Sequence, residues 1–164
     1  MQGKTQRKSS KDRRGRREKP EYDQKLLDLA RVTRVVKGGR RFRFRATVVI
    51  GNRKGRVGVG VSKGNDVSDA ISKAYNDAMR HLVDVVMSDS TIPHSVYIKK
   101  GSAKILLKPA TAGRGVIAGG AVRSVVDLAG IHDIVSKSLG TSNKLNVARA
   151  TIDALKQLRR EKRL

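Results

Sequence analysis

Polar and apolar residues alternate in RRFRFRATVVI, residues 40–50, with the period of a β-strand. Phe42, Phe44 and the apolar residues after them share one face, which needs a cover to become a core. The opposite face begins with the arginines of the strand, Arg41, Arg43 and Arg45. A strand that is apolar on one side and cationic on the other raises the question of what the arginines contact.

A Gly-Gly pair separates this strand from another β-rich run, RVTRVVK. Gly38-Gly39 predicts a hairpin with a type I′ turn, because that turn needs a positive φ at both central residues. We expect a third strand at residues 56–61, with valines on the apolar face of the sheet and Gly58 and Gly60 on the arginine face. Since glycine weakens a strand unless something approaches it closely, a polyanion is expected on the face that combines arginine with glycine.

Residues 65–86 have apolar residues at helical spacing, beginning at Val67. This helix would cover the apolar face of the sheet, with Asn65 or Asp66 as its cap. The composition of residues 21–30 allows a further short helix. The first part of the chain is therefore expected to have the order β-β-β-α.

The helical pattern breaks near residues 87–91, and we place a domain boundary between residues 88 and 89. Two strands, SVYIKK and KILLKP, are expected around a Gly101-Ser102 turn. A helix in VIAGGAVRSVVDLAG, a strand in IHDIVSKSL and a helix in TSNKLNVARATIDALKQL follow, the last capped by Thr141 or Ser142. Gly119-Gly120 would then lie inside a helix, where glycine costs stability. The usual reason for glycine at such a position is close packing against another element, which we expect here. The predicted fold class is α+β, with domains at residues 21–88 and 89–164.

The net positive charge of the chain indicates the class of partner that this fold binds. The 164 residues include 37 Lys and Arg against 14 Asp and Glu, a formal net charge of +23, which repels itself unless a polyanion neutralises it. Residues 1–20 are a basic arm, expected to be flexible and to order on nucleic acid. Residues 29–65 and 90–126 contain no acid. Nucleic acid is the expected partner, and an anionic membrane surface is the second choice.

Other function classes lack their signatures in this sequence. Without cysteine the chain has no disulfides and no Cys-based zinc site, and no apolar run approaches the roughly 20 residues of a membrane span. The histidines lack metal-ligand spacing, and no nucleophile elbow, P-loop or paired-carboxylate motif occurs. We therefore expect no enzyme activity, cofactor or metal. With Phe42 and Phe44 in the core, phosphate contacts with folded RNA are expected rather than base stacking.

Two long runs, VKGGRRFRFRATVVIGNRKGRVGVGVSKGNDVSDAISKA and LLKPATAGRGVIAGGAVRSVVDLAGIHDIVSKSLGTSN, resemble the family of small-subunit ribosomal protein five in its bacterial-type form. The resemblance extends over about residues 21–158 and includes Gly39-Arg40, Phe44, Gly51-Asn52 and Gly55. It implies an N-terminal domain like those that bind double-stranded RNA. It also implies a C-terminal β-α-β-α domain with a left-handed crossover, as in some kinases and ribonucleases.

The same resemblance implies a structural role in the cytoplasmic ribosome. The expected partners are 16S-type rRNA at the junction of body and neck, ribosomal proteins four and eight of the small subunit, and mRNA near its entrance. An influence on translational accuracy is also expected. Two alternatives stay open: a free RNA chaperone or nucleoid-type DNA binder, which the charge alone would fit, and a small-molecule kinase, suggested only by the fold of the second domain.

We predict RNA contacts at three sets of residues. The resemblance assigns the hairpin residues Thr33, Arg34, Lys37, Gly38, Gly39 and Arg40. Charge and strand face add Arg41, Arg43, Arg45, Arg53, Lys54 and Arg56. In the second domain the candidates are Lys104, Lys108, Arg114 and Arg123.

Overall fold

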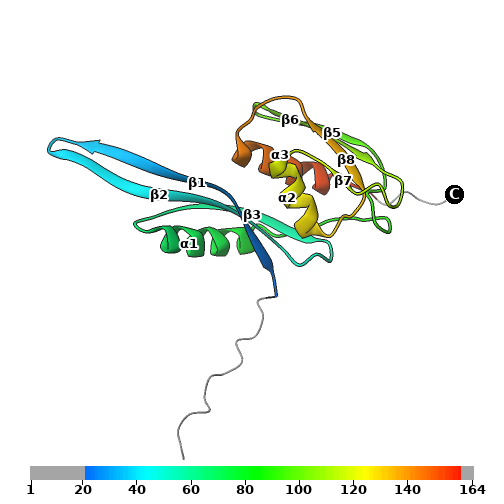
Figure 1. Cartoon of the computed structure of the whole chain (residues 1–164), viewed down its shortest axis with the longest axis horizontal. Helices are drawn as coiled ribbons and strands as arrows, with labels where there is room; N and C mark the ends of the chain where they lie inside the picture. The colour runs from blue at the N-terminus through cyan, green and yellow to red at the C-terminus, as the bar shows by residue number, and fades with distance from the viewer. Residues whose placement is uncertain (1–20, 160–164) are drawn as a thin grey trace, which may run out of the picture.

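The computed structural model describes residues 21–159, and within them two four-stranded sheets each carry helices (Figure 1). The first half consists of β1 (Asp23–Val36), β2 (Gly39–Gly51), β3 (Arg56–Gly64), α1 (Val67–Arg80) and β4 (Val83–Asp84). The second half consists of β5 (Val96–Lys100), β6 (Ala103–Pro109), β7 (Val116–Ile117), α2 (Gly120–Ala129), β8 (Ile134–Ser138) and α3 (Lys144–Lys156). The sheet orders are β1-β2-β3-β4 and β5-β6-β8-β7. The predicted α+β class, β-β-β-α followed by a mixed β/α half, is confirmed.

Strands β1 and β2 form a long antiparallel hairpin whose tip projects away from the rest of the molecule (Figure 1). The short helix that residues 21–30 allowed is wrong, because residues from Asp23 onward already pair with β2. Pairing along a partly buried strand overrides the local helix propensity of this segment. The hairpin is therefore longer than the sequence indicated.

The turn of the hairpin differs from the predicted type. Val36 pairs with Gly39, so the two turn residues are Lys37 and Gly38 rather than Gly38 and Gly39. Gly39 has a φ of 151°, whereas Gly38 does not belong to the glycines with positive φ. The predicted hairpin is confirmed, but its type I′ turn with two positive φ angles is wrong.

Helix α1 covers the apolar face of the first sheet, as the sequence predicted. Its buried side is made of alanines, Ala70, Ala74 and Ala78, which pack against apolar residues of β2. The helix ends at Arg80, earlier than the periodicity indicated, because residues 83–84 pair with β3 as an edge strand. Small residues on the helix bring it unusually close to the sheet.

The glycines of β3 face α1, which reverses the predicted faces of this strand. Gly58 and Gly60 pair with apolar residues of β2 that pack under the helix. A Cβ atom on Gly60 would lie 2.2 Å from the carbonyl oxygen of Ala74, so these glycines admit the helix rather than a polyanion. Val57 and Val59 point to the other face, where the second half of the chain covers them.

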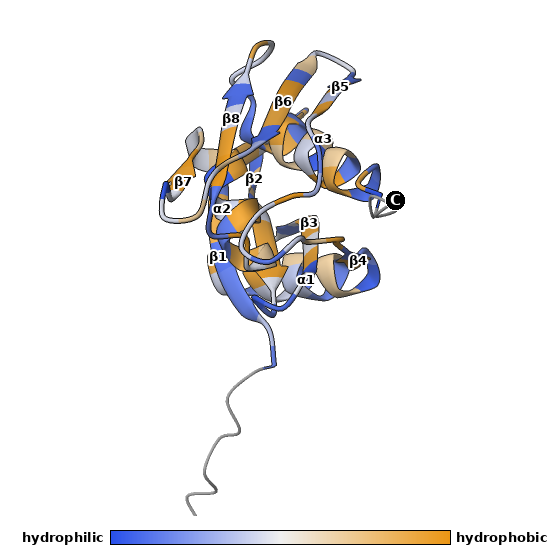
Figure 2. Ribbon diagram, turned by 90° about the vertical axis from the view of Figure 1, so that its right-hand side faces the viewer, coloured by the Kyte–Doolittle hydropathy of each residue, from blue (hydrophilic) through white to orange (hydrophobic). Residues whose placement is uncertain are grey.

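The two halves share one apolar core. Val49 of β2 and the two inward valines of β3 belong to the same cluster as the inner residues of β6, β8, α2 and α3. Figure 2 shows apolar segments gathered where these elements meet and a mostly hydrophilic β1. The loop after β2 docks its backbone on the end of α2, since the N–H of Arg53 donates to the Leu128 carbonyl (3.0 Å) and that of Gly55 to the Ala129 carbonyl (2.9 Å).

Helix α2 begins at Gly120, after a short strand that the sequence analysis missed. Residues 116–117, which we expected inside the helix, form β7, parallel to β8. Gly119-Gly120 therefore stands at the helix start, and no atom lies within 4 Å of a Cβ placed on either residue. The predicted close packing of this pair is wrong. Strands β7 and β8 with α2 between them form the crossover unit of the second half.

The start of α3 is capped by Asn143, whose side-chain oxygen accepts from the N–H of Leu145 (3.1 Å), and not by Thr141 or Ser142. The basic arm at residues 1–20 and the last residues of the chain lie outside the described residues. The domain boundary at residue 88 stays a prediction.

Candidate nucleic-acid interface

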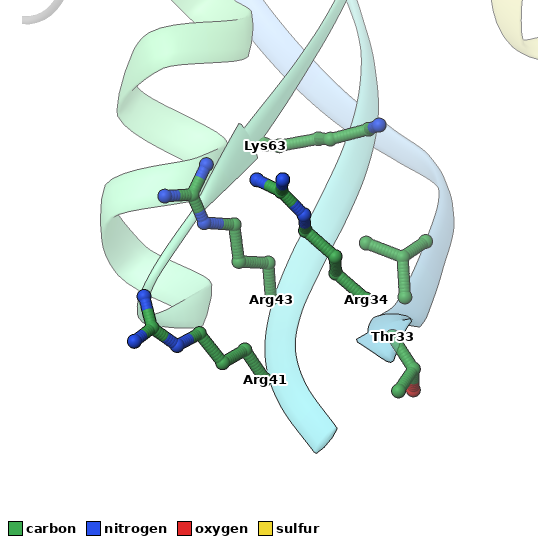
Figure 3. Close-up of a pocket in the computed structure, with 6 residues that line it drawn as sticks. Thr33, Arg34, Arg41, Arg43 and Lys63 are labelled. Atoms are coloured by element: carbon green, nitrogen blue, oxygen red, sulfur yellow. The ribbon is translucent and has the colours of Figure 1, made fainter. Parts of the chain in front are cut away.

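Cationic side chains from three strands gather on the face of the hairpin opposite α1. Arg34 pairs with Arg41 across the hairpin, and Arg45 pairs with Lys63 of β3. Residues directly opposite each other in an antiparallel pair point to the same face, and Arg43 lies between the two β2 arginines on that face. Figure 3 shows four of these side chains reaching over the surface. We call this set, Arg34, Arg41, Arg43, Arg45 and Lys63, the hairpin basic face.

A pocket of about 220 Å³ lies within the hairpin basic face. Its lining consists of Val32, Thr33, Arg34, Arg41, Arg43 and Lys63, without any acidic residue. Guanidinium groups present planar forks of N–H donors that match phosphate oxygens, and the lysine ammonium adds a compact positive charge. The chemistry of this pocket suits a phosphate group.

The hairpin basic face carries unbalanced charge. Like charges directly opposite each other destabilise a sheet, and this holds for Arg34 with Arg41 and for Arg45 with Lys63. Within residues 21–159, only Arg45 of this set forms an ion pair, with Asp28 at 3.9 Å. The buried Nε of Arg45 has no hydrogen-bond partner in the same residues. An anion on this face would neutralise the charges and supply acceptors.

The tip of the hairpin continues the positive surface. The predicted tip residues Lys37, Gly38, Gly39 and Arg40 are all exposed. Arg40 pairs with Val35 and therefore belongs to the opposite face. Thr33 pairs with Phe42, so its side chain also belongs to that opposite face, although the residue contributes to the pocket lining. The predicted hairpin residues thus divide between two faces.

Phe42 is the clearest error in the predicted core. Phe42 is 46% exposed, because β3 ends before reaching it. Phe44, two residues farther from the tip, is the last β2 residue that pairs with β3. Arg31, which the sequence analysis did not single out, places its guanidinium carbon 3.6 Å from the centroid of the Phe42 ring. The contact between Arg31 and Phe42 could have been inferred only by knowing where β3 ends, and the sequence does not mark that end.

The predicted residues of the loop after β2 lie at the far end of the strand from the tip. Arg53 forms an ion pair with Asp23 (Nε to Oδ2, 2.9 Å), and Arg56 forms one with Asp84 (Nε to Oδ1, 2.7 Å). The hydrogen bond with Asp84 is the main reason that the pKa of Arg56 lies above its usual value. Lys54 is exposed. These charges are separate from the hairpin basic face and partly balanced by acids.

Lys104 and Lys108 lie on the outer face of the second sheet, away from α2 and α3. Lys99, which pairs with Lys104, and Lys137 of β8 join them there. We call these four lysines the sheet lysines. The period of β5 and β6 around the predicted turn could have identified Lys99. The position of Lys137 beside the other lysines follows from the pairing of β8 with β6, which has no local sequence signal.

Arg114 lies in the exposed loop between β6 and β7, and a buried carboxylate fixes this loop. Asp133 accepts from the N–H of Gly115 (2.8 Å) and from the hydroxyl of Ser90 (2.6 Å). The Ser90 hydroxyl first, and the Gly115 N–H second, hold the pKa of Asp133 below its usual value. Arg123 is exposed on α2, with its Nε 4.0 Å from a carboxylate oxygen of Asp127. The predicted residues of the second half therefore do not form one surface with the hairpin.

None of the helices in residues 21–159 is long and apolar enough to cross a membrane.

Comparison with known proteins identifies the family. The model of the ribosomal protein S5 N-terminal domain matches residues 22–86, and that of the ribosomal protein S5 C-terminal domain matches residues 98–164. Small ribosomal subunit protein uS5 from Campylobacter jejuni strains 81-176, 81116 and RM1221 is 56% identical over 139 residues, 85% of this chain and 95% of each relative. The resemblance that the sequence suggested is confirmed: the chain belongs to the ribosomal protein S5 family and is a ribosomal protein rather than an enzyme.

Proposed function

We propose that this protein is a structural constituent of the small ribosomal subunit that binds 16S-type rRNA mainly through the hairpin basic face. The observation that carries the proposal is the pairing of Arg34 with Arg41 on a projecting hairpin, with no acid of residues 21–159 in an ion pair with either. An isolated protein gains nothing from placing two arginines directly opposite each other. The arrangement becomes favourable when RNA phosphates lie between and above them.

The hairpin basic face acts by phosphate neutralisation. Arginine binds phosphate oxygens through two parallel N–H donors, which fixes the direction of approach as well as the charge. Phosphate contacts position a protein on RNA without reading the base sequence. The RNA would therefore be selected by its folded shape, where two backbones approach closely enough to contact a narrow, two-stranded hairpin from several sides.

The family resemblance supports a finer placement. In this proposal the hairpin, with its tip at Lys37 to Arg40, lies at the junction of body and neck and limits movement of the head. The second half, with the sheet lysines, Arg114 and Arg123, contacts further rRNA and ribosomal proteins four and eight. Through these contacts the protein would contribute to translational accuracy and to the mRNA entrance. Residues 21–88 and 89–164 would act as two domains joined by their shared core.

Sedimentation of the tagged full-length protein on sucrose gradients tests this function. The proposal predicts one copy per small subunit, retained after a high-salt wash because many phosphate contacts act together. A loose binder that neutralises roughly eight phosphates would lose orders of magnitude in affinity over a fourfold rise in salt. Release into the light fractions, or a spread over total RNA and DNA, would contradict the proposal and favour the free chaperone.

A further inference from the structure

We propose that the second face of the hairpin, which carries Arg31 and Phe42, binds an unpaired RNA base that stacks on this pair of side chains. The inference rests on the proposed function, because it requires the hairpin to lie in RNA. It adds a different contact: the hairpin basic face holds phosphates, and the opposite face holds a base. The hairpin would then be clamped from both sides.

The first step is the position of Phe42. Its partner across the hairpin is Thr33, and the hairpin is only two strands wide there because the β2–β3 pairing ends at Phe44 and Gly64. Phe42 is 46% exposed, and Val35, on the same face nearer the tip, is 75% exposed. Within residues 21–159, no helix or strand covers this part of the hairpin, which projects beyond α1 (Figure 1).

The second step is the arrangement of the two side chains. Arg31 and Phe42 come from neighbouring strands and lie diagonally on one face, since Arg31 pairs with Phe44 and Thr33 with Phe42. The guanidinium carbon stands 3.6 Å from the ring centroid, which is a stacking distance. Arginine and phenylalanine planes are the surfaces on which proteins stack splayed-out RNA bases. A base that joins this stack meets side chains that are already ordered.

The third step is the charge around the stack, which favours a nucleotide over an apolar protein segment. Arg40 lies on the same face as Arg31, and no acid occurs in residues 29–65. An apolar protein segment on this face would bury two guanidinium groups without a counter-charge, which is costly. A nucleotide offers a flat π surface to the stack and a phosphate to Arg40. The occupant that fits both features is an unpaired nucleotide of RNA.

A single tryptophan reports the proposed stack directly. The chain has no Trp, so full-length Phe42→Trp contains one indole, at the stacking position. We expect its fluorescence to be quenched when 16S rRNA binds, because a base stacks on it, and to change much less when inorganic polyphosphate binds the arginines. Binding itself is followed separately by gel shift. RNA that binds without more quenching than polyphosphate would overturn the stack and leave the proposed function intact, whereas absence of RNA binding would contradict the proposed function.

Affinity gives a second test that does not depend on fluorescence. Phe42→Leu keeps an apolar side chain on the strand but removes the π surface, and should weaken 16S rRNA binding about tenfold, the scale of one stacked base. The slope of affinity against salt should stay the same, since no phosphate contact is lost. Tyr75→Leu on α1 removes an aromatic ring from a partly buried position away from the stack; it is the control and should have no effect on affinity. A Phe42→Leu loss under twofold, or a lower salt slope, would overturn the inference.

Discussion

The two halves of β2 belong to one continuous strand but have opposite environments. Residues 39–43 are exposed on both faces, whereas residues 46–51 are buried on both faces. In the buried half, α1 covers one face and the second half of the chain covers the other. In the projecting half, the arginines and Phe42 have no such cover within residues 21–159. A single strand is therefore core at one end and exposed, as the proposed binding surface, at the other.

Because of this difference, we expect the two ends of β2 to serve separate purposes: the buried end stabilises the fold, and the projecting end binds RNA. Side chains in the buried half are fixed by close packing, so changes there should unfold or loosen the protein. Side chains in the projecting half make few contacts within the protein, so changes there should leave stability nearly unaltered and alter RNA binding. The predictions below test this separation, beginning with the largest expected effect.

Replacing Gly60 by Ala should disrupt the close packing of α1 on the buried half of the first sheet. The new Cβ would lie 2.2 Å from the Ala74 carbonyl oxygen and 2.4 Å from the Ala78 backbone nitrogen, which forces α1 away from the sheet. Overpacking of this kind costs about 3 kcal/mol of unfolding free energy, measured by urea unfolding followed by circular dichroism. Gly38→Ala, with no atom within 4 Å of its new Cβ, should change stability by less than about 0.5 kcal/mol. Equal losses in both variants would contradict the separation.

A pair of valine substitutions compares the two environments with the same chemistry. Val49 is fully buried in the shared core, and Val35 is 75% exposed near the hairpin tip. Val49→Ala should cost about 2 kcal/mol, since it removes two methyl groups and leaves a cavity. Val35→Ala should cost less than about 0.5 kcal/mol. The urea midpoints of the two variants give the comparison, and a Val35→Ala loss as large as that of Val49→Ala would show that the tip is covered in solution.

The loop of Arg114 is an intermediate case, exposed but fixed by a buried carboxylate. The pKa of Asp133 is lowered in the folded protein, mainly by the Ser90 hydroxyl, so its ionised form favours folding. This contribution is present above the unfolded pKa of about 3.9 and is lost as pH falls through the lower folded value. Asp133→Asn should therefore lower the urea midpoint at pH 7, by less than Val49→Ala, and the difference from wild type should shrink at pH 3. A difference that is the same at both pH values would contradict this role.

Local patterns predicted the element types better than their partners. The alternation in residues 40–50 correctly indicated a strand with arginines on one face, and the helical spacing of apolar residues from Val67 onward indicated α1. The face of the β3 glycines could not be inferred, because it depends on register with β2 and on a second cover that comes from the other half of the chain. β7 is only two residues long and forms through parallel pairing with β8, so no local period marks it.

The candidate site was predictable only in part, for the same reason. Charge and alternation correctly placed Arg41, Arg43 and Arg45 together on one face. Lys63 joins them only through the β2–β3 register, and the exposure of Phe42 follows from where β3 ends. Arg53 and Arg56 have acid partners that lie far away in sequence, Asp23 and Asp84. Residue type indicated that a candidate interface exists, but strand pairing and ion pairs determine which residues belong to it.

The most direct test of the account compares two double variants that each remove two positive charges from the first half. Arg41→Gln/Arg43→Gln alters the hairpin basic face, and Lys73→Gln/Arg80→Gln alters the exposed side of α1. Affinity for 16S rRNA is measured by filter binding over a range of salt concentrations. The account predicts that the slope of log affinity against log salt falls by about 2 for the hairpin variant, with unfolding stability equal or higher, and changes little for the α1 variant. Equal losses in both variants would contradict it, because net charge rather than the projecting hairpin would then bind the RNA.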